Sequence, residues 1–325
     1  MRRIVSIAQI VSVAASFALT GADRAGAVEK IVTGVLGSYT SGAWPVLIGI
    51  RKGFFAKRGI ELDIVFGPSA PGLVQQLAAG SLDLVAVNGV VEPIHAVEKG
   101  APVAILRIIG QTPNYAMLAK PSIKTIQDLK GKTIAIGGLR DINRIYLDGV
   151  LVPNGLKEGD YDILVIGASG ARLAALKSGA IDATMLVPPA SFEAQRLGFS
   201  NIGLVRDYAG DLPQTGMQIS RRWAATRKKV AGDLVEAVDE SVAWFYDVAN
   251  RDEAIEIMTT AAKANRPEVA ESYDFLSRIE FFARSGKVRR VPLVKMMQAM
   301  KDMNDISSII PVEKLVLEGV TAIED

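Results

Sequence analysis

The residue types that could do chemistry in this sequence favour binding over catalysis. The chain contains one histidine, His95, and no cysteine, which excludes disulfides, thiolate metal sites, cysteine nucleophiles and iron–sulfur clusters. A single histidine also argues against catalytic zinc and against a Ser-His-Asp triad. No nucleophile and base pair or carboxylate cluster with motif-like spacing takes their place. We therefore predict a protein that is not an enzyme and that holds no metal or cofactor.

Arg140 is the best candidate for a charged binding residue. It follows the predicted strand Thr133–Ile136 and the pair Gly137 and Gly138, at a point where a helix is predicted to begin. A guanidinium in such a loop could act beside helix-end amides to hold an anionic group. A structural ion pair with the neighbouring Asp141 is the alternative.

The composition is that of an ordinary globular protein. The 325 residues are 49% hydrophobic and 22% charged, and this length favours two domains. With 37 Lys and Arg against 35 Asp and Glu, the net charge is only +2. No basic stretch is interleaved with aromatic residues, so we expect no nucleic-acid partner.

Residues 1–27 have the character of a secretory signal peptide. Arg2 and Arg3 give a positive start, Ile4–Leu19 is mostly apolar, and Ala25–Ala27 offers small residues for a signal peptidase. A membrane anchor is the alternative, but this run is shorter than the roughly 20 residues that span a bilayer. Because there is no cysteine for lipid attachment, we expect the mature protein to be free in a bacterial periplasm.

From Val28 onward, apolar strands alternate with helical stretches in two successive units. Strands are predicted in the first unit at 31–36, 61–66, 82–87 and 103–109, and in the second unit at 133–136, 161–166 and 181–187. Strands separated by helices imply right-handed crossovers and a parallel sheet covered on both faces. The predicted fold class is therefore α/β, with two lobes that each contain a mainly parallel sheet flanked by helices.

The two units share a short signature. Leu77–Leu84 aligns with Leu176–Ala183, and in both segments a glycine stops a helix and an aspartate opens the next strand. The same element order on both sides of this signature indicates an internal repeat.

The chain is expected to cross between the lobes twice. We assign residues 28–110 to lobe 1, 111–214 to lobe 2, and 215–325 to a return to lobe 1 followed by C-terminal helices. The crossings are predicted near 110–115 and 211–217, each with Pro and Thr. Lobes joined in this way would close on a ligand by hinge bending.

The ligand site is expected at the strand ends. Ligands of open parallel sheets bind beyond the carboxyl ends of the strands, where loop amides and helix N-termini converge. Trp44 would equally suit the lobe core, and Ser69 and Asn88 would suit caps or turns. The predicted site residues are Ser38, Tyr39, Ser41, Trp44, Pro68, Ser69, Asn88 and Gly89 from lobe 1, and Gly138, Leu139, Arg140, Gly167, Ser169 and Pro188 from lobe 2.

Three segments carry a resemblance to a known group of proteins. Ile50–Leu62, Leu77–Leu84 and Asp128–Ala135 resemble the nitrate, sulfonate and taurine, and thiamine-pyrimidine precursor group of periplasmic substrate-binding proteins of ABC importers. The likeness covers residues 29 to about 210. It implies a type II periplasmic-binding fold, ligand capture between two α/β lobes, and delivery to an inner-membrane permease driven by a cytoplasmic ATPase.

These observations predict a monomeric solute-binding component of an ABC importer. The resemblance and Arg140 point to a small organic anion, a carboxylate or a sulfonate, and Tyr39 with Trp44 would allow an aromatic body. Two alternatives stay open: a protein that signals ligand occupancy to a membrane receptor, and a pyrimidine-precursor binding protein. An enzyme of the related fungal pyrimidine-synthase type would need a cysteine-containing motif, which this chain lacks.

Overall fold

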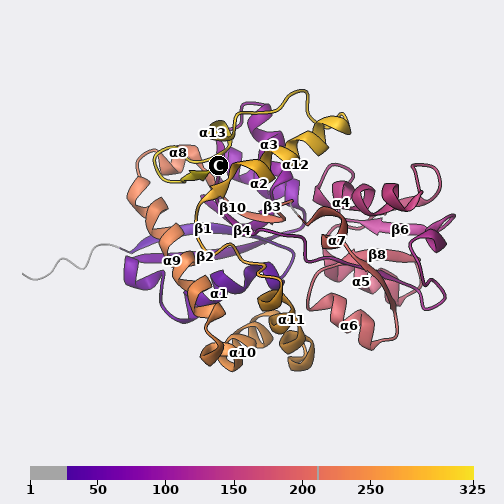
Figure 1. The fold of residues 1–325 in the computed structure, drawn as a ribbon. Helices are drawn as coiled ribbons and strands as arrows, with labels where there is room; N and C mark the ends of the chain where they lie inside the picture. Colours follow the sequence, from indigo (N-terminus) through magenta and orange to yellow (C-terminus); the bar gives the residue numbers. More distant parts are fainter. Residues whose placement is uncertain (1–27, 211) are drawn as a thin grey trace, which may run out of the picture.

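Two five-stranded sheets organise the chain, one in each of two lobes that lie side by side (Figure 1). The computed structural model describes residues 28–210 and 212–325. The predicted signal peptide, residues 1–27, lies outside the described residues. Within the described ranges, no helix is both long and apolar enough to cross a membrane.

The first lobe is built on a sheet with the strand order β2-β1-β3-β10-β4. Helices follow its early strands, as the alternation of apolar runs and helical stretches predicts. The strands are β1 (Glu29–Leu36), β2 (Ile60–Gly67), β3 (Leu84–Gly89), β4 (Val103–Gly110) and β10 (Thr215–Ser220), and the helices are α1 (Trp44–Arg51), α2 (Ala70–Ala79) and α3 (Val91–Glu98).

The second lobe repeats this arrangement with the strand order β7-β6-β8-β5-β9. α5 starts directly at the loop that follows β7. The strands are β5 (Ala116–Ala119), β6 (Thr133–Ile136), β7 (Asp162–Val165), β8 (Ala183–Leu186) and β9 (Ser200–Leu204), and the helices are α4 (Ile142–Leu151), α5 (Ser169–Lys177), α6 (Ala190–Arg196) and α7 (Arg206–Ala209).

In each sheet one strand runs against the others. β10 is antiparallel to β3 and β4, and β5 is antiparallel to β8 and β9. Both strands follow a passage of the chain from one sheet to the other, so each enters its new sheet from the opposite end. The expected mainly parallel α/β fold is confirmed, whereas β5, β9 and β10 were absent from the sequence-based assignment.

The glycine and aspartate of the shared sequence signature have the same structural roles in both lobes. Gly80 and Gly179 end their helices with φ of 85° and 78°, a left-handed conformation that glycine adopts without strain. Asp83 Oδ2 accepts a hydrogen bond from the Val32 amide at 3.0 Å, and Asp182 Oδ2 accepts one from the Thr133 amide at 2.9 Å. Each aspartate thus joins the start of its strand to the neighbouring central strand.

The C-terminal third of the chain packs its helices around the first lobe (Figure 1). α9 and α10 contact α1, while α11 reaches α6 of the second lobe. Phe192 of α6 and Phe275 of α11 meet edge to face, with ring centroids 6.0 Å apart. The remaining elements are α8 (Arg221–Ala224), α9 (Lys228–Tyr246), α10 (Arg251–Ala262), α11 (Arg266–Arg278), α12 (Arg290–Asp302), α13 (Val312–Leu315), β11 (Val288–Arg289) and β12 (Ile323–Glu324).

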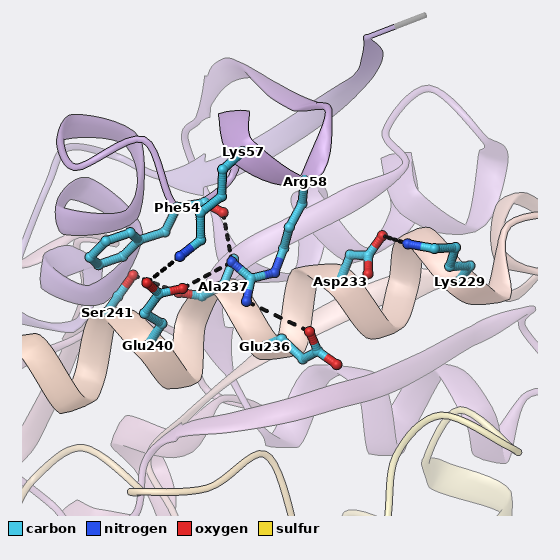
Figure 2. Close-up of polar contacts among 9 residues, drawn as sticks. All are labelled: Phe54, Lys57, Arg58, Lys229, Asp233, Glu236, Ala237, Glu240 and Ser241. Atoms are coloured by element: carbon cyan, nitrogen blue, oxygen red, sulfur yellow. Dashed lines mark hydrogen bonds and ion pairs between the residues drawn. The ribbon is translucent and has the colours of Figure 1, made fainter. Parts of the chain in front are cut away.

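The segment that follows α1 is held against α9 by surface charges (Figure 2). Lys57 pairs with Glu240, and Arg58 bonds the same carboxylate at 3.0 Å while also donating to the Phe54 carbonyl at 2.9 Å. Glu236, one turn earlier on α9, lies 3.6 Å from Arg58. Half-exposed ion pairs of this kind add little stability, so they orient the segment more than they hold the lobe together.

Candidate ligand-binding cleft

A cavity of about 320 Å³ lies between the two lobes. Its walls come from the loops and first helical turns that follow β1, β2 and β3 in the first lobe and β6 and β7 in the second. Tyr115, Gln214 and Thr215, which belong to the two passages between the sheets, complete the lining. This volume is in the range of sites for small organic molecules.

Most of the residues nominated from the strand ends line this cavity. Ser69 also serves as the N-cap of α2, because its hydroxyl accepts a hydrogen bond from the Gly72 amide at 3.3 Å. Asn88 and Gly89, which we expected in a turn, are instead the last residues of β3. The nominated residues in the lining are Ser38, Ser41, Pro68, Ser69, Asn88, Gly89, Gly138, Gly167 and Ser169.

The two aromatic candidates lie elsewhere. Trp44 is fully buried in the first-lobe core, where its indole Nε1 donates to the Ala254 carbonyl of α10 at 2.7 Å. Tyr39 packs edge to face on Phe66 with ring centroids 5.1 Å apart, and it is not among the cavity-lining residues. Of the two interpretations of Trp44, the lobe core is confirmed and the aromatic wall is wrong, because α10 accepts its N–H and the core buries its ring.

Arg140 is also outside the cavity lining. Its Nε donates to Asp305 Oδ1 at 2.6 Å and its Nη2 to the Asp305 carbonyl at 2.7 Å. Asp305 Oδ2 in turn lies 2.5 Å from His95 Nε2. Arg140 thus pairs across the lobes with Asp305 and not with adjacent Asp141. We leave it out of the proposed site.

Leu139 and Pro188 are likewise absent from the lining. The Leu139 side chain is 58% exposed on the surface. Pro188 lies behind the cavity, where its carbonyl accepts a hydrogen bond from the Ser41 amide at 3.2 Å. That bond and the one from Asn114 Nδ2 to Ser41 Oγ at 3.0 Å fix Ser41 at the junction of the lobes.

Glu92 is the acidic residue that the first lobe contributes to the cavity. It stands in the first turn of α3 and is only 4% exposed, yet neither carboxyl oxygen hydrogen-bonds another residue. Burial, followed by the nearby charge of Asp141, raises the pKa of Glu92 to about 8. Burying a carboxyl without a hydrogen-bond partner lowers the stability of the fold. This side chain is therefore available to bind a ligand.

Asp141 is the matching carboxylate of the second lobe. It caps α4, and its Oδ1 accepts from the Asn143 amide at 2.8 Å while its Oδ2 accepts from Asn143 Nδ2 at 3.2 Å. Burial outweighs these hydrogen bonds and raises the pKa of Asp141 to about 6. The sequence predicts Asp141 only as a partner for Arg140.

Arg172, on α5, is the one cation among the described residues that line the cavity. It is buried, and its guanidinium donates to the Gly167 carbonyl, to Ser169 Oγ at 3.1 Å and to the Met185 carbonyl at 3.1 Å. Tyr115 lies beside it, and burial raises the pKa of that phenol to about 12. Arg172 therefore organises the loop between β7 and α5 as well as charging the cavity.

Two glycines make room for these charged groups. A Cβ at Gly89 would collide with the Glu92 carboxyl, and a Cβ at Gly137 would collide with Asp141 Oδ2 and the Asn143 amide. Each glycine ends a strand or follows it directly. The absence of a side chain there lets a carboxyl fold back over the strand end.

The rest of the cavity wall is apolar. Aliphatic side chains come from both lobes and give the site a body that suits hydrocarbon or an aromatic ring. They are Val35, Leu36, Val87, Ile142, Val165 and Val187. Among residues 28–210 and 212–325, no three His, Asp or Glu side chains gather as metal ligands.

The family model described as "NMT1/THI5 like" matches residues 41–253 of the chain. The chain belongs to this family. Two curated relatives agree: a protein of Haemophilus influenzae named for thiamine biosynthesis, 28% identical over 144 residues, and the formylaminopyrimidine-binding protein of Halalkalibacterium halodurans, 30% identical over 141 residues. These matches cover 43% and 42% of this chain, and they span only 44% and 41% of the relatives' own lengths.

Solved structures show the fold of this NMT1/THI5-like protein. The alkanesulfonate-binding protein of Xanthomonas axonopodis pv. citri, solved with MOPS, superposes with a TM-score of 0.73 at 19% identity, covering 90% of this chain and 99% of its own. The periplasmic aliphatic sulphonate-binding protein of Escherichia coli gives 0.70 at 19% identity, covering 90% and 98%. The expected periplasmic-binding fold is thereby confirmed, and the family match agrees with the group that the sequence resembles.

Three cavity residues of this NMT1/THI5-like protein that the sequence does not predict share one position. Glu92, Asn143 and Arg172 each lie in the first turn of a helix, a few residues beyond the loops that we nominated. A helix that begins at a strand end presents its first turn to the same cavity as the loop. Extending each nomination by one helical turn would have found all three.

Proposed function

We propose that this protein is the solute-binding component of an ABC import system and acts in the periplasm. The observation that carries this proposal is the cavity between two α/β lobes joined by two chain passages. Such a construction suits capture by closure, with no need for chemistry on the ligand. The family and the structural neighbours support the same role.

The solute is a small organic molecule with an apolar body. A cavity of about 320 Å³ with aliphatic walls suits such a body, and the polar groups at the strand ends would orient it. The expected organic anion rested on the family resemblance and on Arg140, and Asp305 already binds Arg140. The alternative, a nitrogen heterocycle such as a pyrimidine precursor, is supported by the name of one relative, the formylaminopyrimidine-binding protein.

A direct test is to identify what the purified protein carries and what it does with it. The mature protein would be denatured and its extract examined by mass spectrometry, and each recovered compound would be returned to ligand-free protein. We expect small-angle scattering to show compaction on binding and the compound to be recovered unchanged. Chemical turnover of the compound by the pure protein would contradict the proposal.

Import and sensing are separated by a second measurement. A strain that lacks this chain should lose uptake of the labelled compound if the protein feeds a permease. Uptake that persists, together with loss of a transcriptional response to the compound, would assign the protein to signalling.

A further inference from the structure

We propose that the cleft selects a ligand that presents positively charged N–H donors, and that Glu92 of the first lobe and Asp141 of the second hold it from opposite sides. This inference rests on the proposed function and specifies its ligand class. A suitable ligand is an amidine, an amine or a protonated amino-heterocycle with an apolar body.

The buried side-chain atoms of the cavity lining that have no hydrogen-bond partner are almost all oxygens. Four buried oxygens of lining side chains have no partner: both carboxyl oxygens of Glu92, Oδ1 of Asn88 and Oδ1 of Asn143. Among the described lining residues, the matching set of unpartnered buried donors contains only Nε of Arg172. Buried polar atoms are normally satisfied, so the ligand is expected to bring the missing donors.

The orientation of the two amides is set by their neighbours. Asn88 Nδ2 donates to the Ala70 carbonyl at 3.2 Å, and Asn143 Nδ2 donates to Asp141 Oδ2 at 3.2 Å. Turning either amide over would place an oxygen against an oxygen. The free atom is therefore the acceptor in both cases.

Arg172 does not offset this excess of acceptors. Three of its five N–H groups already donate to two carbonyls and to Ser169. Both N–H groups of Nη2 are among these three, so an anion in the cavity would not meet the free fork of Nε and Nη2. The same anion would face the ionised carboxylate of Asp141 and, as the pH rises toward the Glu92 pKa of about 8, that of Glu92 as well. Like charges at short range in a buried site are unfavourable, and this disfavours carboxylates and sulfonates.

The two carboxyls also connect the ligand to lobe closure. Glu92 feels Asp141 across the cleft, with Asp305, Tyr115 and Arg172 as the other ionisable groups around the pair. Burial and, after it, the negative charge of Asp141 raise the pKa of Glu92. A cation between them replaces repulsion with attraction on both sides, so its binding favours the closed form and releases a proton from Glu92.

Three probes with the same ring separate charge from donor capacity. Benzamidine carries a charged donor pair, benzamide carries a neutral donor, and benzoate carries a charged acceptor pair. We expect calorimetric titration at pH 7 to rank them in that order, with compaction in small-angle scattering for benzamidine. Tighter binding of benzoate than of benzamidine would overturn the inference while leaving the proposed function intact.

The variants Glu92→Gln and Asp141→Asn test the two residues. Each should weaken benzamidine binding by about 30-fold, the loss typical of one partner in a buried charge pair. The matched controls are Glu98→Gln on the same helix as Glu92, and Asp148→Asn on the same helix as Asp141. Both control residues are outside the cavity lining and should leave affinity unchanged, so equal losses in variant and control would contradict the assignment.

A measurement without any ligand decides the matter even if no probe binds. At pH 8.5 the Glu92 carboxyl of the empty wild-type protein is largely ionised and unpartnered, so Glu92→Gln should raise the melting temperature. A structural Glu92 would behave oppositely, because Gln would then remove a stabilising carboxylate. A lowered melting temperature for Glu92→Gln at this pH overturns the inference.

Discussion

The two lobes use the same backbone device to build their sheets and different side chains to face the cavity. Asp83 and Asp182 bind the central strands of their lobes in the same way, after glycines with the same left-handed conformation. At the cavity the lobes differ: Asp141 is anchored by Asn143, whereas no other residue hydrogen-bonds the Glu92 carboxyl. The two lobes therefore share the contacts that assemble their sheets and differ in the side chains that face the cavity.

The difference also separates the energetic roles of the two walls. The second lobe presents an organised network of Asp141, Asn143 and Arg172, with most of its polar atoms already satisfied. The first lobe presents the Glu92 carboxyl, which has no hydrogen-bond partner and is already desolvated before a ligand binds. We infer that the first lobe supplies the larger change in interaction on binding, and that the second supplies the fixed template.

The largest expected effect is a loss of stability from a substitution in the core of the first lobe. Trp44→Ala would remove a fully buried ring and its hydrogen bond to the Ala254 carbonyl, at a cost of roughly 3–5 kcal/mol. Thermal unfolding followed by calorimetry should show a large fall in melting temperature. Trp44→Phe, which keeps the ring but loses the N–H donor, is the control and should cost less; equal costs would mean that the hydrogen bond carries the effect.

The next effect tests the shared aspartates. Asp83→Ala and Asp182→Ala should each cost about 1–3 kcal/mol, because each leaves strand amides without an acceptor. Asp182→Ala should cost more, since Asp182 also pairs with Lys120 at 2.8 Å, an interaction that lowers the pKa of Asp182. Chemical denaturation of both variants gives the comparison. A larger loss for Asp83→Ala would contradict a stabilising role of the ion pair between Asp182 and Lys120.

A pH series distinguishes the two cavity carboxyls. Both have folded-state pKa values above their ordinary ones, so each stabilises the fold at low pH and loses that contribution as pH rises through its folded pKa. For Glu92 the loss runs from about 4.5 to about 8, and for Asp141 from about 3.8 to about 6. Unfolding free energies of the empty protein should therefore fall between pH 6 and 8 in wild type.

Variants of the two carboxyls show which lobe causes the fall in unfolding free energy between pH 6 and 8. Glu92→Gln should flatten the curve between pH 6 and 8, and Asp141→Asn should flatten it mainly below pH 6. A wild-type stability that rises between pH 6 and 8 would contradict the burial of Glu92 as an unpartnered acid.

The smallest expected effect concerns the charged segment in Figure 2. Lys57→Ala would remove a half-exposed partner of Glu240, and such pairs contribute no more than about 1 kcal/mol. The melting temperature should change by a degree or two at most, with affinity for any cavity ligand unchanged. A large loss of stability would show that this surface pair does more than orient the segment. Lys229→Ala, on the exposed side of α9, is the control.

Hydrophobic periodicity and glycine punctuation were sufficient to predict the α/β class and most of the strands. They could not reveal β5, a four-residue strand, or β10, which overlaps the predicted crossing, because neither has a periodic flank. The ion pair between Arg140 and Asp305 joins residues 165 positions apart, so the neighbouring Asp141 looked like the natural partner. For the same reason the sequence does not decide whether Trp44 lies in the cavity wall or in the core: the groups that bury it come from helices more than 200 residues later.

The two passages between the lobes are tied to each other. Gln214 Oε1 accepts from the Asn114 amide at 2.7 Å, and Gln214 Nε2 donates to Asn114 Oδ1 at 2.8 Å, with both side chains buried. Twisting one passage against the other would break both bonds, whereas bending the two together breaks neither. We therefore expect the relative motion of the lobes to have a single soft degree of freedom. If the lobes move along a single hinge motion, the cavity walls return to the same relative position at each closure. Little conformational entropy is then lost each time the cleft shuts.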